Sequence, residues 1–151
     1  MKIQLADIIQ ETVVDGPGLR FSVYVQGCPH GCKGCHNPHT HDFEGGYTAD
    51  TDDILEQILE NPLLDGVTFS GGEPFCQTPA LAELARKIKT LTDLNIVVYT
   101  GFTFEYLKER PEYAPLLDAA DYLIDGRFEQ DLKDYSLKFR GSSNQRFLPV
   151  K

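Results

Sequence analysis

Four short segments rich in β-branched and aromatic residues alternate along this chain with segments of helical spacing. These segments are residues 20–26, 66–70, 95–100 and 121–125. Each is followed at once by a glycine, a residue that commonly ends a strand. Strands that alternate with helices form βαβ units, and the pattern therefore predicts an α/β fold built on a parallel sheet.

Three further segments are expected to be helices. The acidic residues 50–53 offer an N-terminal cap to an apolar helical face that continues to Leu59. Residues 79–91 repeat apolar positions at helical spacing and carry basic residues near their end, where these suit the helix dipole. Residues 104–110 form a short candidate helix before Pro111. No repeat or Ser/Pro-rich linker interrupts the chain, so residues 1–151 are expected to form one domain.

The chain of 151 residues is acidic, with a formal net charge of −9, and 41% of its residues are hydrophobic. This length is enough to bury a core without disulfides or a structural metal. The acidic surface disfavours nucleic-acid binding, because Lys and Arg form no runs that could hold phosphates. No apolar stretch approaches the ~20 residues of a membrane span, and the N-terminus lacks the apolar core of a signal peptide. We therefore expect a cytoplasmic protein without nucleic-acid or membrane partners.

Three of the four cysteines lie within eight residues of one long loop, directly after the first predicted strand. Cys28, Cys32 and Cys35 form a C-x3-C-x2-C pattern. Cys76 stands alone and is expected to be a small, buried or half-buried residue without a role. In a reducing cytosol, clustered thiols are more often metal ligands or redox groups than structural disulfides.

Two kinds of metal centre fit three clustered cysteines. A zinc site would take a loop histidine as fourth ligand, the candidates being His30, His36, His39 and His41. A 4Fe-4S cluster takes four ligands, so three cysteines would leave one iron open to a substrate or cofactor. Structural zinc motifs usually pair ligands from two separated segments, whereas all candidates here share one loop. The spacing favours iron–sulfur, with zinc as the alternative.

Unusual residues also follow the other predicted strands. Gly71-Gly72-Glu73-Pro74 comes directly after the second strand, Thr100 ends the third and Asp125 ends the fourth. Because the carboxyl ends of parallel strands meet at one edge of a sheet, active sites of such folds gather there. Two glycines would admit a ligand without a side-chain clash, and the Glu73 carboxylate could accept hydrogen bonds from an ammonium group. The alternative is an ordinary turn between a strand and a helix.

The chain resembles the radical S-adenosylmethionine (SAM) enzymes, and among them the activating enzymes of anaerobic ribonucleotide reductases. The resemblance rests on the C-x3-C-x2-C loop and the Gly-Gly-Glu-Pro run, and it extends to residues 15–20 (DGPGLR), 35–37 (CHN) and 140–145 (RGSSNQ). It implies an open partial (β/α) barrel with a parallel sheet, shorter than a full eight-fold barrel. It further implies reductive cleavage of SAM to a 5′-deoxyadenosyl radical, which would remove a hydrogen atom from a glycine of the large subunit of the anaerobic ribonucleoside-triphosphate reductase. A reduced flavodoxin-like protein would donate the electron.

The resemblance also assigns roles to single residues. It makes Cys28, Cys32 and Cys35 the ligands of the 4Fe-4S cluster. The residues it places near SAM are Gly71, Gly72, Glu73, His36, Thr100 and Asp125. The candidates for contact with the substrate or partner are Asp15, Ser142, Ser143 and Asn144. Simpler interpretations exist for several of them: Asp15 and Asp125 as turn residues, His36 as a loop histidine, and the tail as a surface loop.

Two rival functions remain at this point. The chain could activate another glycyl-radical enzyme, such as one of the pyruvate formate-lyase type, although its short length and its tail disfavour this. It could also be a zinc-stabilised binding module without enzymatic activity. That account explains the cysteines but gives no purpose to residues 71–74 at a strand end.

Overall fold

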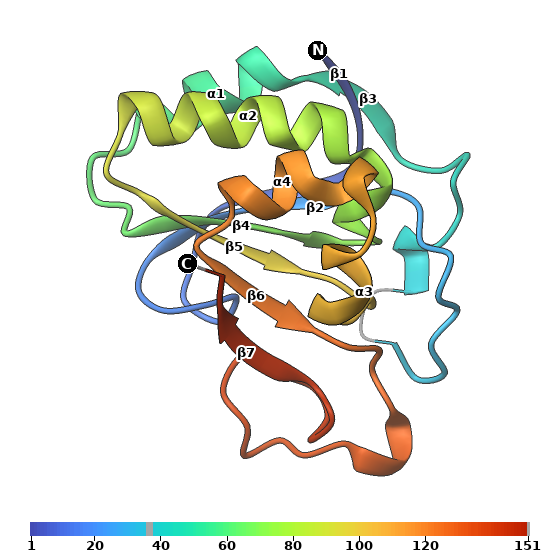
Figure 1. Cartoon of the computed structure of the whole chain (residues 1–151). Coiled ribbons are helices and arrows are strands. Elements are labelled where there is room, and N and C mark those ends of the chain that lie inside the picture. Colours follow the sequence, from blue (N-terminus) through green and yellow to red (C-terminus); the bar gives the residue numbers. More distant parts are fainter. Residues whose placement is uncertain (36–37, 151) are drawn as a thin grey trace.

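The computed structural model describes residues 1–35 and 38–150. Its centre is a seven-stranded sheet in the order β3-β1-β2-β4-β5-β6-β7 (Figure 1). The strands are β1 (Lys2–Thr12), β2 (Arg20–Val25), β3 (Tyr47–Asp50), β4 (Gly66–Gly71), β5 (Asn95–Tyr99), β6 (Tyr122–Asp125) and β7 (Arg146–Pro149). The α-helices are α1 (Thr51–Leu59), α2 (Thr78–Leu91), α3 (Phe104–Lys108) and α4 (Ala114–Ala119). Short 3-10 turns are η1 (Pro38–Thr40), η2 (Pro74–Gln77), η3 (Pro111–Tyr113) and η4 (Gln130–Leu132).

The four predicted strands are β2, β4, β5 and β6, which are neighbours and run parallel. The α/β class and a parallel centre are therefore confirmed. The sheet is only partly parallel, because β1 pairs antiparallel with β2, β3 with β1, and β7 with β6. These added strands pair with both sides of the parallel group, so none of its four members lies at an edge of the sheet.

The predicted helices are also present, with small changes at their ends. The Asp50 side chain accepts a hydrogen bond from the Asp52 N–H and so caps α1, as its acidic start predicted. Helix α2 begins at Thr78, and α3 ends at Lys108, two residues before the predicted end at Arg110. Helix α4 was not predicted, since its six residues are too few to show a helical period.

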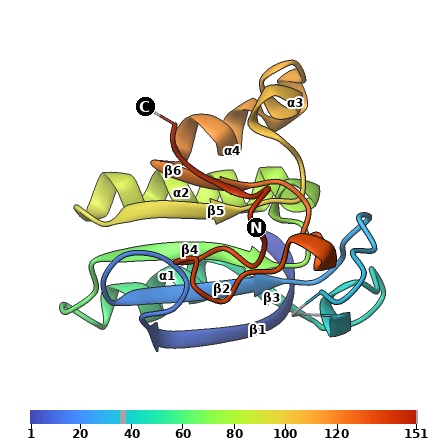
Figure 2. The same ribbon diagram turned by 90° about the horizontal axis from the view of Figure 1, so that it is seen from below.

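The two faces of the parallel strands differ sharply in character. Side chains alternate between faces along a strand, and the apolar ones face α1, α2 and α4, which lie on one side of the sheet in Figure 1. This core contains Phe21, Val23, Val67, Phe69, Ile96, Val98 and Leu123. The opposite face carries polar and aromatic side chains, among them Ser22, Tyr24, Thr68, Ser70 and Tyr99. The segment that connects β6 to β7 passes over this second face (Figure 2).

A buried arginine ties this polar face together. The Arg20 guanidinium is fully buried, and it donates hydrogen bonds to Thr68 Oγ1 at 2.7 Å and to the carbonyls of Pro17, Val67 and Asn95 at 2.9, 2.8 and 3.3 Å. Burial lowers its pKa to about 10. Arg20 thus fixes the loop that precedes β2 against the neighbouring strands β4 and β5.

Candidate functional site

A cavity of about 470 Å³ lies at the carboxyl ends of the parallel strands, on the polar face of the sheet. Its floor is formed by side chains from β2, β4, β5 and β6, namely Tyr24, Ser70, Tyr99 and Ile124. The cysteine loop forms one wall. The segment between β6 and β7 forms another wall, to which Tyr135, Phe139 and Gln145 contribute. The location agrees with the rule that ligands bind at the carboxyl ends of parallel strands.

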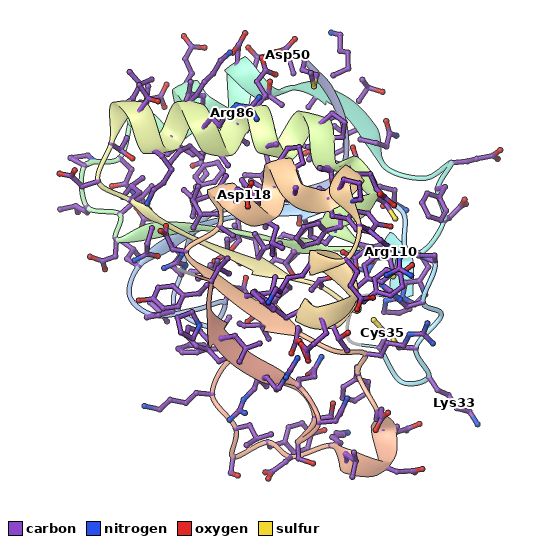
Figure 3. All side chains as sticks on the ribbon, in the orientation of Figure 1. Lys33, Cys35, Asp50, Arg86, Arg110 and Asp118 are labelled. Carbon is purple, nitrogen blue, oxygen red and sulfur yellow. The ribbon has the colours of Figure 1, made fainter. Side chains whose placement is uncertain are left out.

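All three clustered cysteines line this cavity and are half-buried. The loop that carries them is closed at its base by main-chain hydrogen bonds from Gly27 N–H to the Thr40 carbonyl, 2.6 Å, and from Cys28 N–H to the His41 carbonyl, 3.2 Å. Figure 3 shows Cys35 beside the ends of the strands, with Lys33 of the same loop extending away from the ribbon. The spacing of the cysteines thus predicted their common location.

Burial raises the pKa values of the Cys28 and Cys32 thiols, and main-chain hydrogen bonds oppose that shift. The opposing bond comes from His30 in the case of Cys28 and from Phe128, which follows β6, in the case of Cys32. Main-chain N–H groups directed at cysteine sulfur favour the thiolate, which is the form that binds metals. Two segments far apart in the sequence thus direct main-chain hydrogen bonds at these sulfurs.

The donor set fits an iron–sulfur cluster. Three half-buried cysteines of one loop line the same cavity. A 4Fe-4S cluster would bind each of them to a different iron, and its remaining iron would have no cysteine ligand. Within residues 1–35 and 38–150, no group of three His, Cys, Asp or Glu side chains is arranged to hold a single ion.

Gly71 and Gly72 also line the cavity, at the end of β4. Gly71 has a φ of +97°, and a Cβ on Gly72 would lie 2.3 Å from the Gly27 carbonyl oxygen. Only glycine allows the strand end to pass so close to the start of the cysteine loop. The glycine pair therefore has two effects: it leaves room for a ligand, and it lets the end of β4 lie against the cysteine loop.

Glu73 behaves differently from its glycine neighbours. Its side chain is fully buried, and the residue is not among those that line the cavity in the described part of the chain. Its carboxylate accepts hydrogen bonds from Thr100 Oγ1 (2.8 and 2.9 Å), Gly101 N–H (2.8 Å), Phe75 N–H (3.0 Å) and His30 Nε2 (2.6 Å). The direct contact with SAM that the resemblance implied stays a prediction. Thr100, which does line the cavity, is a partner of this carboxylate.

Sequence reasoning missed His30 and Gln145. His30 was considered as a possible zinc ligand and otherwise as an ordinary loop residue, yet its ring is bound to Glu73. Gln145 Oε1 accepts hydrogen bonds from Gly141 N–H (2.8 Å) and Ser142 N–H (3.1 Å), while its Nε2 donates to the Gly126 carbonyl (3.0 Å). Gln145 stands in the segment 140–145 that carries the resemblance, but the hydrogen-bond partners of both residues are set by the tertiary fold and no local pattern predicts them.

Asp15 lines the cavity, and its role near a substrate opening stays a prediction. Its carboxylate accepts hydrogen bonds from Ser22 Oγ, 3.0 Å, and from the Tyr24 hydroxyl. Burial, together with this contact to Asp15, raises the pKa of Tyr24 well above its usual range. Asp15 is therefore more than a turn former, because it fixes two side chains of β2.

Asp125 is placed away from the cavity. Its side chain is buried, is not among the lining residues that the structure describes, and accepts hydrogen bonds from Arg146 and from the Phe104 N–H at 2.8 Å. Arg146 also binds Glu105 at 2.9 Å. These contacts give Asp125 a structural task in joining β6, β7 and α3, and its contact with SAM stays a prediction.

Most of the predicted contact residues of the tail form hydrogen bonds within the protein. Ser142 is buried, and its hydroxyl donates to Asn144 Oδ1, 2.6 Å, and accepts from the Glu129 N–H, 3.2 Å. Asn144 Nδ2 donates to the Arg127 carbonyl at 2.8 Å. Ser143 is exposed. The tail thus holds the segment 126–129, whose Phe128 N–H reaches Cys32, against the cysteine loop.

His36, predicted to lie beside the adenine, falls outside the described residues.

Comparison with known proteins identifies the class. The family model of the 4Fe-4S single cluster domain matches residues 14–148, so the chain belongs to the 4Fe-4S single cluster domain family. The crystal structure of QueE from Escherichia coli aligns with a TM-score of 0.49 at 20% identity, over 68% of this chain and 54% of that chain. Among residues 1–35 and 38–150, no helix combines the length and apolar character needed to cross a membrane.

The sequence relatives specify the family more narrowly. The chain is 36% identical over 140 residues to the anaerobic ribonucleoside-triphosphate reductase-activating protein of Vibrio cholerae, across 88% of this chain and 89% of the relative. The protein of the same name from Haemophilus influenzae is 37% identical over 142 residues, with the same coverage. That of Escherichia coli K12 is 35% identical over 140 residues, across 88% of this chain and 90% of the relative. The chain belongs to the family of anaerobic ribonucleoside-triphosphate reductase-activating proteins, which favours the iron–sulfur interpretation over zinc.

Proposed function

We propose that this chain is a radical SAM enzyme that generates a glycyl radical on the large subunit of the anaerobic ribonucleoside-triphosphate reductase. The observation that carries the proposal is the meeting of three cysteines and the Gly71-Gly72 strand end in one cavity. The names and identities of its relatives point to the same partner enzyme.

In this proposal, Cys28, Cys32 and Cys35 hold the 4Fe-4S cluster and leave one position for SAM. When bound, the reduced cluster supplies one electron to the SAM sulfonium, giving methionine and a 5′-deoxyadenosyl radical that takes a hydrogen atom from a glycine Cα. A reduced flavodoxin-like protein is proposed as the source of that electron. The chain's own residues bind, orient and enclose these groups.

Different walls of the cavity serve different parts of that task. Gly71 and Gly72 present main chain without side-chain bulk where the methionine part of SAM would lie. The segment 134–145 covers the polar face of the sheet and limits the access of water to the radical. Asp15 and Tyr24 both line the cavity and are proposed to face the substrate peptide.

The overall form follows from the same proposal. The four parallel strands and their helices would make up an open partial (β/α) barrel, and residues 1–151 would form one radical SAM domain. An incomplete barrel would leave a lateral opening for a loop of the reductase. A cytoplasmic location stays a prediction.

Anaerobic reconstitution tests the function. We expect about four iron and four sulfide per chain, with a broad visible absorbance that is lost in Cys32→Ala and kept in the matched control Cys76→Ser. With reductant and SAM, the loaded protein should release 5′-deoxyadenosine. Adding the reductase large subunit should produce a glycyl-radical EPR signal, whereas an enzyme of the pyruvate formate-lyase type should give none. One zinc and no iron after careful reconstitution would overturn the proposal.

A further inference from the structure

His30 is buried in the middle of the cysteine loop. Its side chain is only 4% exposed, and its Nε2 lies 2.6 Å from Glu73 Oε1. The residue stands midway between Cys28 and Cys32 in the sequence, so its position controls the course of the C-x3-C segment. A histidine in a polar loop normally remains in contact with water, and its burial here therefore requires a structural reason.

The partner of His30 connects two strand ends. The Glu73 carboxylate is itself fully buried, and it also accepts hydrogen bonds from Thr100 Oγ1 and Gly101 N–H at the end of β5. Through one carboxylate, the cysteine loop is therefore tied to the ends of both β4 and β5. A buried carboxylate with several donors is a rigid anchor, because releasing any one donor would leave a costly unpaired group.

The surroundings of the imidazole are shaped to hold it in one place. A Cβ on Gly101 would lie 2.4 Å from the His30 ring, so only glycine leaves room for the ring at that position. Phe102 contacts the ring edge-to-face, with centroids 4.6 Å apart and planes at 76°. Glu73, Gly101 and Phe102 together enclose the imidazole.

The main chain of the same residue touches a predicted cluster ligand. A main-chain hydrogen bond from His30 reaches the Cys28 sulfur. Hydrogen bonds to cluster sulfurs and the residues that orient the ligands are known to tune the reduction potential of iron–sulfur clusters. The side chain of His30 thus anchors the peptide unit that faces Cys28.

We propose that His30 is a positioning residue for the iron–sulfur centre. Its imidazole, fixed by Glu73, holds the cysteine loop against the ends of β4 and β5 and aims the His30 N–H at the Cys28 sulfur. This inference rests on the proposed function in one respect, namely that Cys28, Cys32 and Cys35 carry the cluster. It does not depend on the reaction that the cluster serves.

The test uses the full chain, reconstituted anaerobically with iron and sulfide. We compare His30→Ala with His30→Gln, whose amide nitrogen can donate to Glu73 Oε1 from nearly the place of the imidazole Nε2. His39→Ala is the matched control, because His39 is an exposed histidine of the same loop. The readouts are iron per chain, the midpoint potential of the cluster and the EPR spectrum of its reduced form.

We expect His30→Ala to shift the midpoint potential to more negative values and to alter the EPR spectrum, with His30→Gln restoring both and His39→Ala changing neither. A wild-type potential and spectrum in His30→Ala would overturn the inference. If His30→Ala takes up no iron, His30→Gln decides: recovery of iron supports the anchoring role, and equal failure in a folded protein contradicts it. Absence of a cluster in the wild-type protein would instead contradict the proposed function.

Discussion

Cys76 lies in η2, three residues after Glu73, and its chemistry separates it from the other three cysteines. The residue is exposed, so the expectation of a buried or half-buried position is wrong; the side chain sits on a turn between β4 and α2 rather than in the core. Partial burial of the thiol itself, with the nearby charges of Glu73 and Cys28, still raises its pKa to about 11.

Cys76 should therefore react slowly with alkylating reagents. Raising a thiol pKa from 9.0 to about 11 lowers the thiolate fraction at pH 8 by about 100-fold, and the greater nucleophilicity of the thiolate recovers about tenfold of the rate. In the cluster-loaded protein we expect Cys76 to be alkylated by iodoacetamide about tenfold more slowly than a thiol of ordinary pKa. Timed labelling with mass spectrometry measures the rate, and Cys76→Ser reports labelling elsewhere. A rate equal to that of the ordinary thiol would contradict the raised pKa.

For single residues, the sequence predicted those features that depend on near neighbours in the chain. The three cysteines and the glycine pair were found because ligand spacing and strand ends can be recognised within a few residues. The His30 to Glu73 contact spans 43 positions, and no pattern in the loop distinguishes an anchoring histidine from a solvated one. The same limit applies to Asp125, whose place at a strand end suggested a ligand contact although its carboxylate faces Arg146.

Among the elements, β7 depends most on charge. It is a four-residue strand without a fully buried side chain, so apolar burial contributes little to its attachment. Arg146 at its start binds the buried Asp125 at the end of β6 and the exposed Glu105 on α3. Hydrogen bonds to these two carboxylates raise the pKa of Arg146 further above its usual range. One arginine therefore connects three elements beside the cavity wall.

Removing that arginine should destabilise the protein. Arg146→Met leaves the buried Asp125 carboxylate with the Phe104 N–H and no cation, and we expect the free energy of unfolding to fall by about 2–3 kcal/mol. Urea unfolding followed by circular dichroism measures the change. Glu105→Gln is the matched control, because it removes only the exposed half of the pair and should cost less than about 0.5 kcal/mol. Equal losses in the two variants would show that the buried carboxylate does not depend on Arg146.

The elements that could be predicted are those with a strong periodic signal. Residues 66–71 and 95–99 are largely buried and contain β-branched and aromatic residues, which is why they were predicted as strands. Strand β1 was missed because most of its eleven residues are exposed or half-buried, and β3 and β7 because four residues show no period. The four parallel strands could thus be predicted from the sequence, whereas the antiparallel strands β1, β3 and β7 could not.

At the scale of the whole molecule, the core and the cysteine loop are separate structures. Most of the buried apolar residues come from the sheet and from α1, α2 and α4, and none of the three clustered cysteines belongs to the core. A zinc-stabilised module of the kind considered from the sequence would lose its fold with its metal. A chain with a core of its own should keep its fold and lose only the order of the loop.

We therefore expect the protein without its cluster to remain folded. The triple variant Cys28→Ala/Cys32→Ala/Cys35→Ala should keep the far-UV circular dichroism of the loaded wild type and unfold cooperatively. Its Tm should match that of cluster-free wild type within about 2 °C, while the loaded protein should melt higher because the cluster binds only the native state. Leu84→Ala, which opens a cavity under α2, is the contrasting variant and should cost about 3 kcal/mol. Loss of cooperative unfolding in the triple variant would show that the cysteine loop, rather than the sheet and its helices, determines the fold.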